Sequence, residues 1–264
     1  MRKGDIDLTP LLQVEGLSKR FGGLMAVNQV SFSVCRGEIF GTIGPNGAGK
    51  TTLLNLISNR YVPNSGRILY RDQNIVGYPP NQIAKLGLVR TFQSTVSYGE
   101  STVWENMMRA QLGYHFLGLW PEFLITRAVR ERKKVQTEKA EALLQFLGLE
   151  RLRDRQARTL PYGYQKLLGL AIALAGDPQL IMLDEPAAGL NHDERLHLMS
   201  AIQKIHQNGV TVILVEHDMK VIMGLCHQIL VLNYGQMIAR GAPADIQRNE
   251  EVIKAYLGED PELA

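Results

Sequence analysis

The stretch that decides the fold is a glycine-rich loop, which reads Gly44-Pro45-Asn46-Gly47-Ala48-Gly49-Lys50-Thr51 and continues into Thr52. It matches the pattern G-x-x-x-x-G-K-[ST], and it lies between a predicted strand at 38–43 and a predicted helix at 50–58. In such a unit the glycines let successive N–H groups point at phosphates, and the helix N-terminus adds its positive dipole end. The sequence therefore predicts a phosphate-binding loop, in which Lys50 reaches the β- and γ-phosphates of a nucleotide and Thr51 binds Mg²⁺.

A second pattern, Leu-Ile-Met-Leu-Asp-Glu at 180–185, is an apolar run that ends in two adjacent acids. A continuous apolar run of this length is typical of a strand buried in a parallel sheet. In phosphate-loop enzymes an acid in this place binds Mg²⁺, which is the role predicted for Asp184. Glu185 is then placed to act as general base toward the attacking water. On its own an Asp-Glu pair often only caps the next helix, but the phosphate-binding loop favours the catalytic interpretation.

Hydrophobic periodicity extends this pattern over the chain and indicates an α/β fold. Further strands are predicted at 30–34, 67–70, 89–92 and 210–215, with a hairpin of 229–232 and 236–239. Between about 93 and 175 the pattern turns helical, with helices predicted at 103–112, 131–147 and 163–175. Helices are also predicted at 193–207, at 219–225 and as two short segments within 243–257. This order predicts a helical lobe inserted between strands of one core.

Composition excludes several classes of function. The chain has 264 residues, 45% of them hydrophobic, and a formal charge of +3 with both signs mixed, which argues against bulk nucleic-acid binding. No stretch approaches the roughly 20 apolar residues of a membrane span, and the longest run, 167–175, reads as a buried helix. Residues 1–11 lack the apolar region of a signal peptide, and the two cysteines, Cys35 and Cys226, lack metal-ligand spacing. A membrane role would have to come through partner proteins.

With these motifs in this order, the chain resembles the ATPase subunit of an ABC transporter over residues 12–258. The resemblance implies a P-loop NTPase ABC cassette, with a RecA-like core and an antiparallel β subdomain at 12–92 and 176–240. It also implies a helical lobe at about 93–175 and a C-terminal helical tail at 241–264.

The resemblance also implies roles for three single residues. Gln93 would contact Mg²⁺ and the attacking water, His217 would contact the γ-phosphate, and Phe21 would stack on adenine. Taken alone, a glutamine, histidine or aromatic residue is more often an ordinary surface or core residue. The order of the motifs is what favours the functional interpretation.

The signature motif of the family corresponds here to residues 160–165, Leu-Pro-Tyr-Gly-Tyr-Gln. The resemblance implies that Tyr162 and Gly163 contact the nucleotide held by an opposing cassette. Pro161 stands where the family usually has serine, so one hydroxyl donor is missing. Proline can still start a helix, because its fixed φ suits the first turn.

Four stretches, 87–93, 184–191, 215–220 and 252–258, resemble the larger ATPase subunit of branched-chain amino-acid uptake systems of the hydrophobic amino-acid or urea-amide type. The implied partners are a second ATPase subunit, two integral-membrane permeases and an extracytoplasmic solute-binding protein, with no nucleic acid. The implied location is the cytoplasmic face of the inner or plasma membrane. Two alternatives stay open: an ATPase for lipid or lipopolysaccharide export, and an ABC-type ATPase not tied to a membrane.

One stretch allows two interpretations. Residues 112–125 are apolar and aromatic, and five basic residues follow between 127 and 134. They could form an amphipathic piece near a membrane or permease. Pro121 and Gly118 interrupt any helix, which favours a loop followed by a solvated basic helix face.

Overall fold

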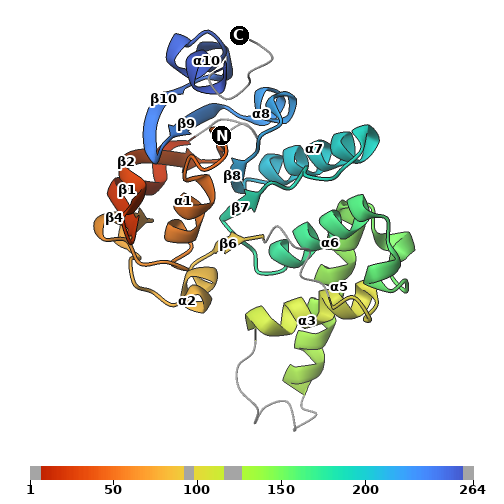
Figure 1. Ribbon diagram of the computed structural model, residues 1–264. Helices are drawn as coiled ribbons and strands as arrows, with labels where there is room; N and C mark the ends of the chain where they lie inside the picture. The colour runs from red at the N-terminus through yellow and green to blue at the C-terminus, as the bar shows by residue number, and fades with distance from the viewer. Residues whose placement is uncertain (1–6, 92–97, 116–126, 258–264) are drawn as a thin grey trace. The chain divides into compact units, whose positions relative to one another are not determined.

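A computed structural model describes residues 7–91, 98–115 and 127–257, and these divide into two compact units (Figure 1). The first unit contains residues 1–90, 179–189 and 202–264. The second contains residues 91–178 and 190–201. Gln93 lies outside the described residues.

The first unit is built on a six-stranded sheet in the order β10-β9-β3-β8-β7-β6 (Figure 1). Neighbouring strands run parallel, except that β10 is antiparallel to β9. Every residue of β3, β7 and β8 is buried, which explains their continuous apolar runs. The strands are β3 (Ile39–Ile43), β6 (Leu88–Arg90), β7 (Leu180–Asp184), β8 (Thr211–Val215), β9 (Gln228–Asn233) and β10 (Gln236–Gly241).

A four-stranded antiparallel sheet in the order β2-β1-β4-β5 completes the strands of this unit. Its strands are β1 (Asp7–Phe21), β2 (Leu24–Arg36), β4 (Ser65–Tyr70) and β5 (Gln73–Asn74). The sequence did not predict β1. Its pairing with β2 shifts register five times and it contains Gly16 at φ 55°, so the alternation that marks a strand is interrupted.

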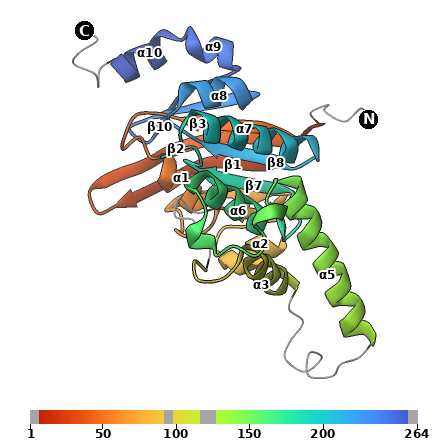
Figure 2. The ribbon, with the colours of Figure 1, turned by 90° about the vertical axis from the view of Figure 1, so that its right-hand side faces the viewer.

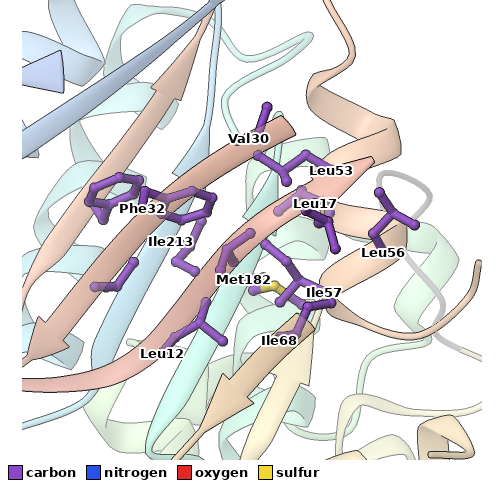
Figure 3. Packing of buried hydrophobic residues seen from close by; sticks show 14 of the residues in the cluster. Leu12, Leu17, Val30, Phe32, Leu53, Leu56, Ile57, Ile68, Met182 and Ile213 are labelled. Atoms are coloured by element: carbon purple, nitrogen blue, oxygen red, sulfur yellow. The ribbon is translucent and has the colours of Figure 1, made fainter. Parts of the chain in front are cut away.

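The helices of the first unit are α1 (Lys50–Ile57), α2 (Pro80–Lys85), α8 (Met219–Leu225), α9 (Pro243–Gln247) and α10 (Glu250–Leu257). Helix α1 packs into one apolar core with residues of both sheets (Figure 3). In this core Leu53 and Ile57 of α1 lie among Leu17 of β1, Ile68 of β4 and Met182 of β7 (Figure 3). The helix that begins in the glycine-rich loop is therefore fixed from both sheets.

The second unit is helical within the described residues (Figure 2). It contains α3 (Val103–His115), α5 (Arg127–Phe146), α6 (Tyr162–Leu174), the short 3₁₀ turns η1 (Glu150–Leu152) and η2 (Ala157–Thr159), and the start of α7 (His192–Gln207). The apolar run in α6 is buried, as its sequence predicts. Arg130, Lys133 and Lys134 of α5 are exposed, which agrees with a solvated basic face. Most of the stretch 112–125 lies outside the described residues.

The predicted α/β fold is confirmed, and the predicted helices and strands recur with ends shifted by a few residues. The patterns in the sequence did not predict β1, β5 or α2, and they predicted only the second half of β2.

Among the described residues no helix is long and apolar enough to cross a membrane. Both Cys35 and Cys226 are free thiols, and burial raises the pKa of Cys226 to about 12.

Candidate nucleotide-binding site

The glycine-rich loop between β3 and α1 has a backbone path that requires glycine at two positions. Gly44 has φ 152°, and a Cβ there would lie 2.1 Å from the carbonyl oxygen of Leu232. Gly49 has φ 100°, and a Cβ there would lie 2.4 Å from the carbonyl oxygen of Ala26. Gly49 is also the N-cap of α1, and no side chain caps this helix. The N–H groups of the first turn therefore suit an anion.

The ammonium group of Lys50 is held inside this loop. Its Nζ donates to the carbonyl oxygens of Gly44 and Pro45, the latter at 2.9 Å, and the residue is only 8% exposed. Thr51, next in α1, is exposed and Thr52 is half-buried. The arrangement presents a buried cation beside an accessible hydroxyl, which are groups that bind phosphate and a hard metal ion.

At the end of β7, the carboxylate of Asp184 forms a buried ion pair with Arg90, the last residue of β6. The Nη2 of Arg90 donates to Oδ2 of Asp184 at 2.7 Å, and the two side chains are 7% and 6% exposed. The Nη1 of Arg90 donates to Oδ1 of Asn55 at 2.7 Å and to Oγ of Ser58 at 3.3 Å. Asn55 lies one helical turn after Thr51, so Arg90 ties Asp184 to α1.

Glu185 follows Asp184 in a strained backbone conformation, with φ 46°. Its N–H donates to the carbonyl oxygen of Val215 at 2.9 Å, and its own carbonyl oxygen accepts from Ala188 N–H at 3.2 Å. The chain therefore turns sharply where the strand ends, and the Glu185 side chain there is half-buried. Left-handed conformations of non-glycine residues are costly and cluster at functional sites.

A buried carboxylate, Glu216, joins the loops that follow β7 and β8. Its Oε1 accepts from Ala187 N–H at 2.6 Å, and its Oε2 accepts from His217 N–H at 3.3 Å. Burial raises the pKa of Glu216, against the effect of these hydrogen bonds. The exposed His217 is thereby fixed relative to the Glu185 turn.

Strand order brings most of these residues to one edge of the sheet (Figure 1). Strands β3, β8 and β7 are parallel neighbours, so their carboxyl ends share an edge. Adjacent strands lie about 4.8 Å apart, which places the ends of β3 and β7 roughly 10 Å apart. The phosphate-binding loop, Asp184, Glu185 and His217 therefore surround one region.

Phe21 lies at the end of β1, where the chain turns into β2, and it is 40% exposed. It pairs with Leu24 across this turn. Two residues later, the carbonyl oxygen of Ala26 approaches Gly49 of the phosphate-binding loop. The ring is therefore exposed in the strand connection that passes the loop, which suits stacking on a nucleotide base.

In the second unit, α6 begins at Tyr162, and Pro161 is its N-cap with a non-helical ψ of 148°, so proline immediately precedes the first turn and does not form part of it. The N–H of Gly163 donates to Oε1 of Glu194 at 3.1 Å. A Cβ at Gly163 would lie 2.8 Å from Cγ of Glu194, so a larger residue here would require the Glu194 side chain to shift. Tyr162 is 42% exposed, and Nζ of Lys166 lies 5.2 Å from the centre of its ring.

Glu194 also belongs to a capping box at the start of α7. Its N–H donates to Oδ1 of Asn191 at 3.0 Å, and its Oε2 accepts from Asn191 N–H at 3.1 Å. One carboxylate thus contacts the N-termini of α6 and α7. Glu194 thereby links the signature motif at 160–165 to the start of α7, although Gly163 and Glu194 lie 31 residues apart in the sequence.

Replacing Asn191 with alanine is expected to lower the free energy of unfolding by about 1 kcal/mol, because α7 loses its N-cap. Urea unfolding of the two proteins measures the difference. Asn191→Asp is the control, since aspartate caps a helix equally well. A loss of the same size in Asn191→Asp would show that the cap is not the cause.

Sequence analysis predicted no role for three residues of this arrangement: Arg90, Glu194 and Glu216. Arg90 belongs to the stretch 87–93, which was used only for the family resemblance, and Glu216 was noted only as the neighbour of His217. A capping-box pattern, Asn191 followed three residues later by Glu194, was the one local signal available.

Comparisons with known proteins agree with this geometry. The sequence profile of the ABC transporter family matches residues 27–188. A profile described as branched-chain amino acid ATP-binding cassette transporter matches residues 236–262.

Two curated proteins are similar over nearly their whole length. The chain is 44% identical over 251 residues to the high-affinity branched-chain amino acid transport ATP-binding protein LivG of Escherichia coli K12, covering 95% of this chain and 98% of that protein. It is 43% identical over 255 residues to BraF of Pseudomonas aeruginosa, described in the same words, with the same coverage.

Two solved structures share the fold. A nucleotide-free ATP-binding cassette from an ABC transporter superposes with a TM-score of 0.83 at 29% identity, covering 95% of this chain and all of that one. An ATP-binding cassette of an ABC transporter in its ADP conformation gives a TM-score of 0.83 at 30% identity with the same coverage.

Proposed function

Because the chain belongs to the ABC transporter family of ATP-binding cassettes, we propose that it binds MgATP and hydrolyses it to drive an importer of branched-chain or other hydrophobic amino acids, or of related small solutes. The observation that carries the proposal is the meeting of the phosphate-binding loop, Asp184 and Glu185 at one sheet edge. The names of the similar LivG and BraF proteins support the class of solute. Residues 12–258 form one cassette in this proposal, with the helical lobe at about 93–175 and the tail at 241–264.

The loop residues Gly44 to Thr52 hold the triphosphate. Backbone N–H groups of the loop and of the first turn of α1 donate to phosphate oxygens. The ammonium group of Lys50 lies beside the loop carbonyls, from where its flexible stem reaches the β- and γ-phosphates. These charge-assisted contacts position the γ-phosphate for transfer to water.

The residues present fit Mg²⁺. This ion takes oxygen ligands and is usually bound by one or two protein groups together with substrate phosphates. Thr51 supplies an exposed hydroxyl, and Asp184 supplies a carboxylate whose Oδ2 pairs with Arg90. Gln93 is the third proposed ligand, on sequence alone. When bound, Mg²⁺ neutralises charge that develops on the phosphate oxygens.

Glu185 accepts the proton of the attacking water. Its backbone turn lies at the end of β7, on the sheet edge that β7 shares with the end of β3. His217, held through Glu216, donates to the γ-phosphate. Phe21 stacks on the adenine, at the opposite end of the nucleotide from these groups.

The site is completed by a second cassette in this proposal. Tyr162 and Gly163 contact the γ-phosphate bound to the opposing chain, and the opposing signature does the same for this chain's nucleotide. The proposed assembly contains a second, different ATPase subunit, two permeases and an extracytoplasmic solute-binding protein. It places this chain on the cytoplasmic face of the inner or plasma membrane.

The isolated chain is expected to hydrolyse ATP slowly, because each complete site needs a signature motif from the opposite chain. Adding the second ATPase subunit should therefore raise the rate. Phosphate release from the chain alone, the partner alone and the mixture measures this. The control is a mixture with chain that carries Gly163→Ala. A Cβ there clashes with Glu194, so the partner's site should lose its signature contact. Full activity in a strict monomer would contradict the shared site.

The same purified chain separates the alternative functions. Capture from a detergent extract should recover permease subunits and a solute-binding protein. Recovery of a lipid-export partner, or of ribosomes or DNA, would contradict the importer assignment while leaving the ATPase site intact.

A further inference from the structure

Two large, partly exposed aromatic side chains contact each other between the end of β1 and the segment that follows α1. Phe21 at the end of β1 and Tyr61 after α1 are 40% and 39% exposed. Their ring centres are 5.2 Å apart with an interplanar angle of 74°, which is an edge-to-face contact. Tyr61 has no role in the nucleotide site described above.

The segment that carries Tyr61 is tied to the helix that begins in the phosphate-binding loop. The N–H groups of Arg60 and Tyr61 both donate to the carbonyl oxygen of Asn55 in α1, at 2.8 and 3.1 Å. Asn59 Nδ2 donates to the carbonyl oxygen of Ile75 at 2.8 Å. The backbone at Tyr61 is therefore fixed relative to α1.

The same segment is tied to β1, next to Phe21. The N–H of Asn64 donates to the carbonyl oxygen of Ser18 at 2.8 Å, and its Oδ1 accepts from Arg20 N–H at 2.7 Å. Nζ of Lys19 donates to the carbonyl oxygen of Val62 at 2.7 Å. These bonds fix the segment that carries Tyr61 to the end of β1 that carries Phe21, which supports the contact between the two rings.

Lys19 adds a second support to the same ring. Its Nζ lies 5.2 Å from the centre of the Phe21 ring, within the range of a cation–π contact. Because this ammonium is anchored on Val62, it cannot follow the ring freely. Phe21 is thus restrained by Tyr61 and by Lys19, yet it stays substantially exposed.

We propose that Tyr61 is a positioning residue of the base site: it fixes the orientation of the Phe21 ring, so that the ring is ready to stack on the adenine of ATP. The inference rests on the proposed nucleotide site and on Phe21 as its base-stacking residue. A ring fixed before binding loses less rotational freedom when the base arrives. Through Asn55, Tyr61 also relates the base end of the site to the helix at its phosphate end.

The test compares Tyr61→Leu with Tyr61→Phe, using calorimetric binding of ATP and of inorganic tripolyphosphate. Leucine removes the edge-to-face contact, and we expect it to weaken ATP binding by about two- to tenfold. Tripolyphosphate has no base, so its affinity should not change. Tyr61→Phe keeps the ring and should bind both ligands as the wild type does. Tyr61→Met serves in place of Tyr61→Leu should the latter fail to fold.

A double-mutant cycle with Phe21→Leu decides whether Tyr61 acts through Phe21. Once Phe21 is absent, Tyr61→Leu should cost no further ATP affinity. Wild-type ATP affinity in Tyr61→Leu, equal losses for ATP and tripolyphosphate, or fully additive losses would each overturn the proposal. Failure of the nucleotide site itself is a different result, because wild-type protein would then bind neither ligand.

Discussion

Changing Glu185 to glutamine is expected to slow ATP hydrolysis by about 10²- to 10⁴-fold while ATP stays bound. The amide has the size of the carboxylate but cannot accept the proton of the attacking water. Glu185 N–H keeps its hydrogen bond to Val215, so the strained turn at φ 46° should survive the change. The contacts proposed for Lys50 and the loop with phosphate do not involve this side chain.

Two measurements separate the chemical step from binding. Single-turnover hydrolysis by the complex with the second ATPase subunit gives the rate, and gel filtration with ATP shows whether the two cassettes stay closed together. Glu150→Gln is the control, because it makes the same chemical change at an exposed carboxylate of the second unit. Normal turnover in Glu185→Gln would remove it as general base, and loss of ATP binding would show that it acts in binding instead.

The central sheet could be predicted from the sequence because the patterns that indicate its strands lie within short stretches of the chain. The apolar runs of β7 and β8 are as long as buried parallel strands, and the glycine-rich loop gives the end of β3 directly. The candidate residues of the site were predicted from the same motifs. The phosphate-binding loop, the acidic pair Asp184 and Glu185, and His217 each lie within a few residues of the end of a strand.

Other parts of the site depend on pairings that local patterns do not contain. Arg90 reaches Asp184 and Asn55 across 94 and 35 residues, so no spacing rule predicts this network. Strand β1 was missed for a different reason, since its register shifts hide the alternation of a strand. Phe21 could be placed only through resemblance, because the strand that carries it was not recognised.

The buried ion pair also shows why the site needs residues outside the motifs. Asp184 is almost fully buried, and a charged group in such a place is costly unless it is paired or hydrogen-bonded. Arg90 pairs with this carboxylate through Oδ2, while Asn55 and Ser58 orient the guanidinium group. The orientation of a metal-binding carboxylate is commonly set by such neighbours.

Replacing Lys50 with alanine is expected to weaken ATP binding by about 10²- to 10⁴-fold, if two charge-assisted contacts of 1.5–3 kcal/mol each are lost. ADP should lose less affinity, because it has no γ-phosphate for Lys50 to contact. The fold should change little, since water can replace Nζ at the carbonyl oxygens of Gly44 and Pro45. Calorimetric binding of both nucleotides and thermal unfolding measure these effects.

The ratio of the two losses identifies the contacts. Equal losses for ATP and ADP would place Lys50 on the β-phosphate alone, and a loss confined to ATP would place it on the γ-phosphate alone. Lys50→Arg keeps the charge but brings a planar guanidinium group to a position where the lysine is buried, so it should restore binding only in part. The exposed Lys204 provides the control, because Lys204→Ala removes the same charge away from the loop. Wild-type affinity for ATP in Lys50→Ala, with Lys204→Ala unchanged, would refute the phosphate-binding loop, because a phosphate contact of this strength cannot be removed without effect.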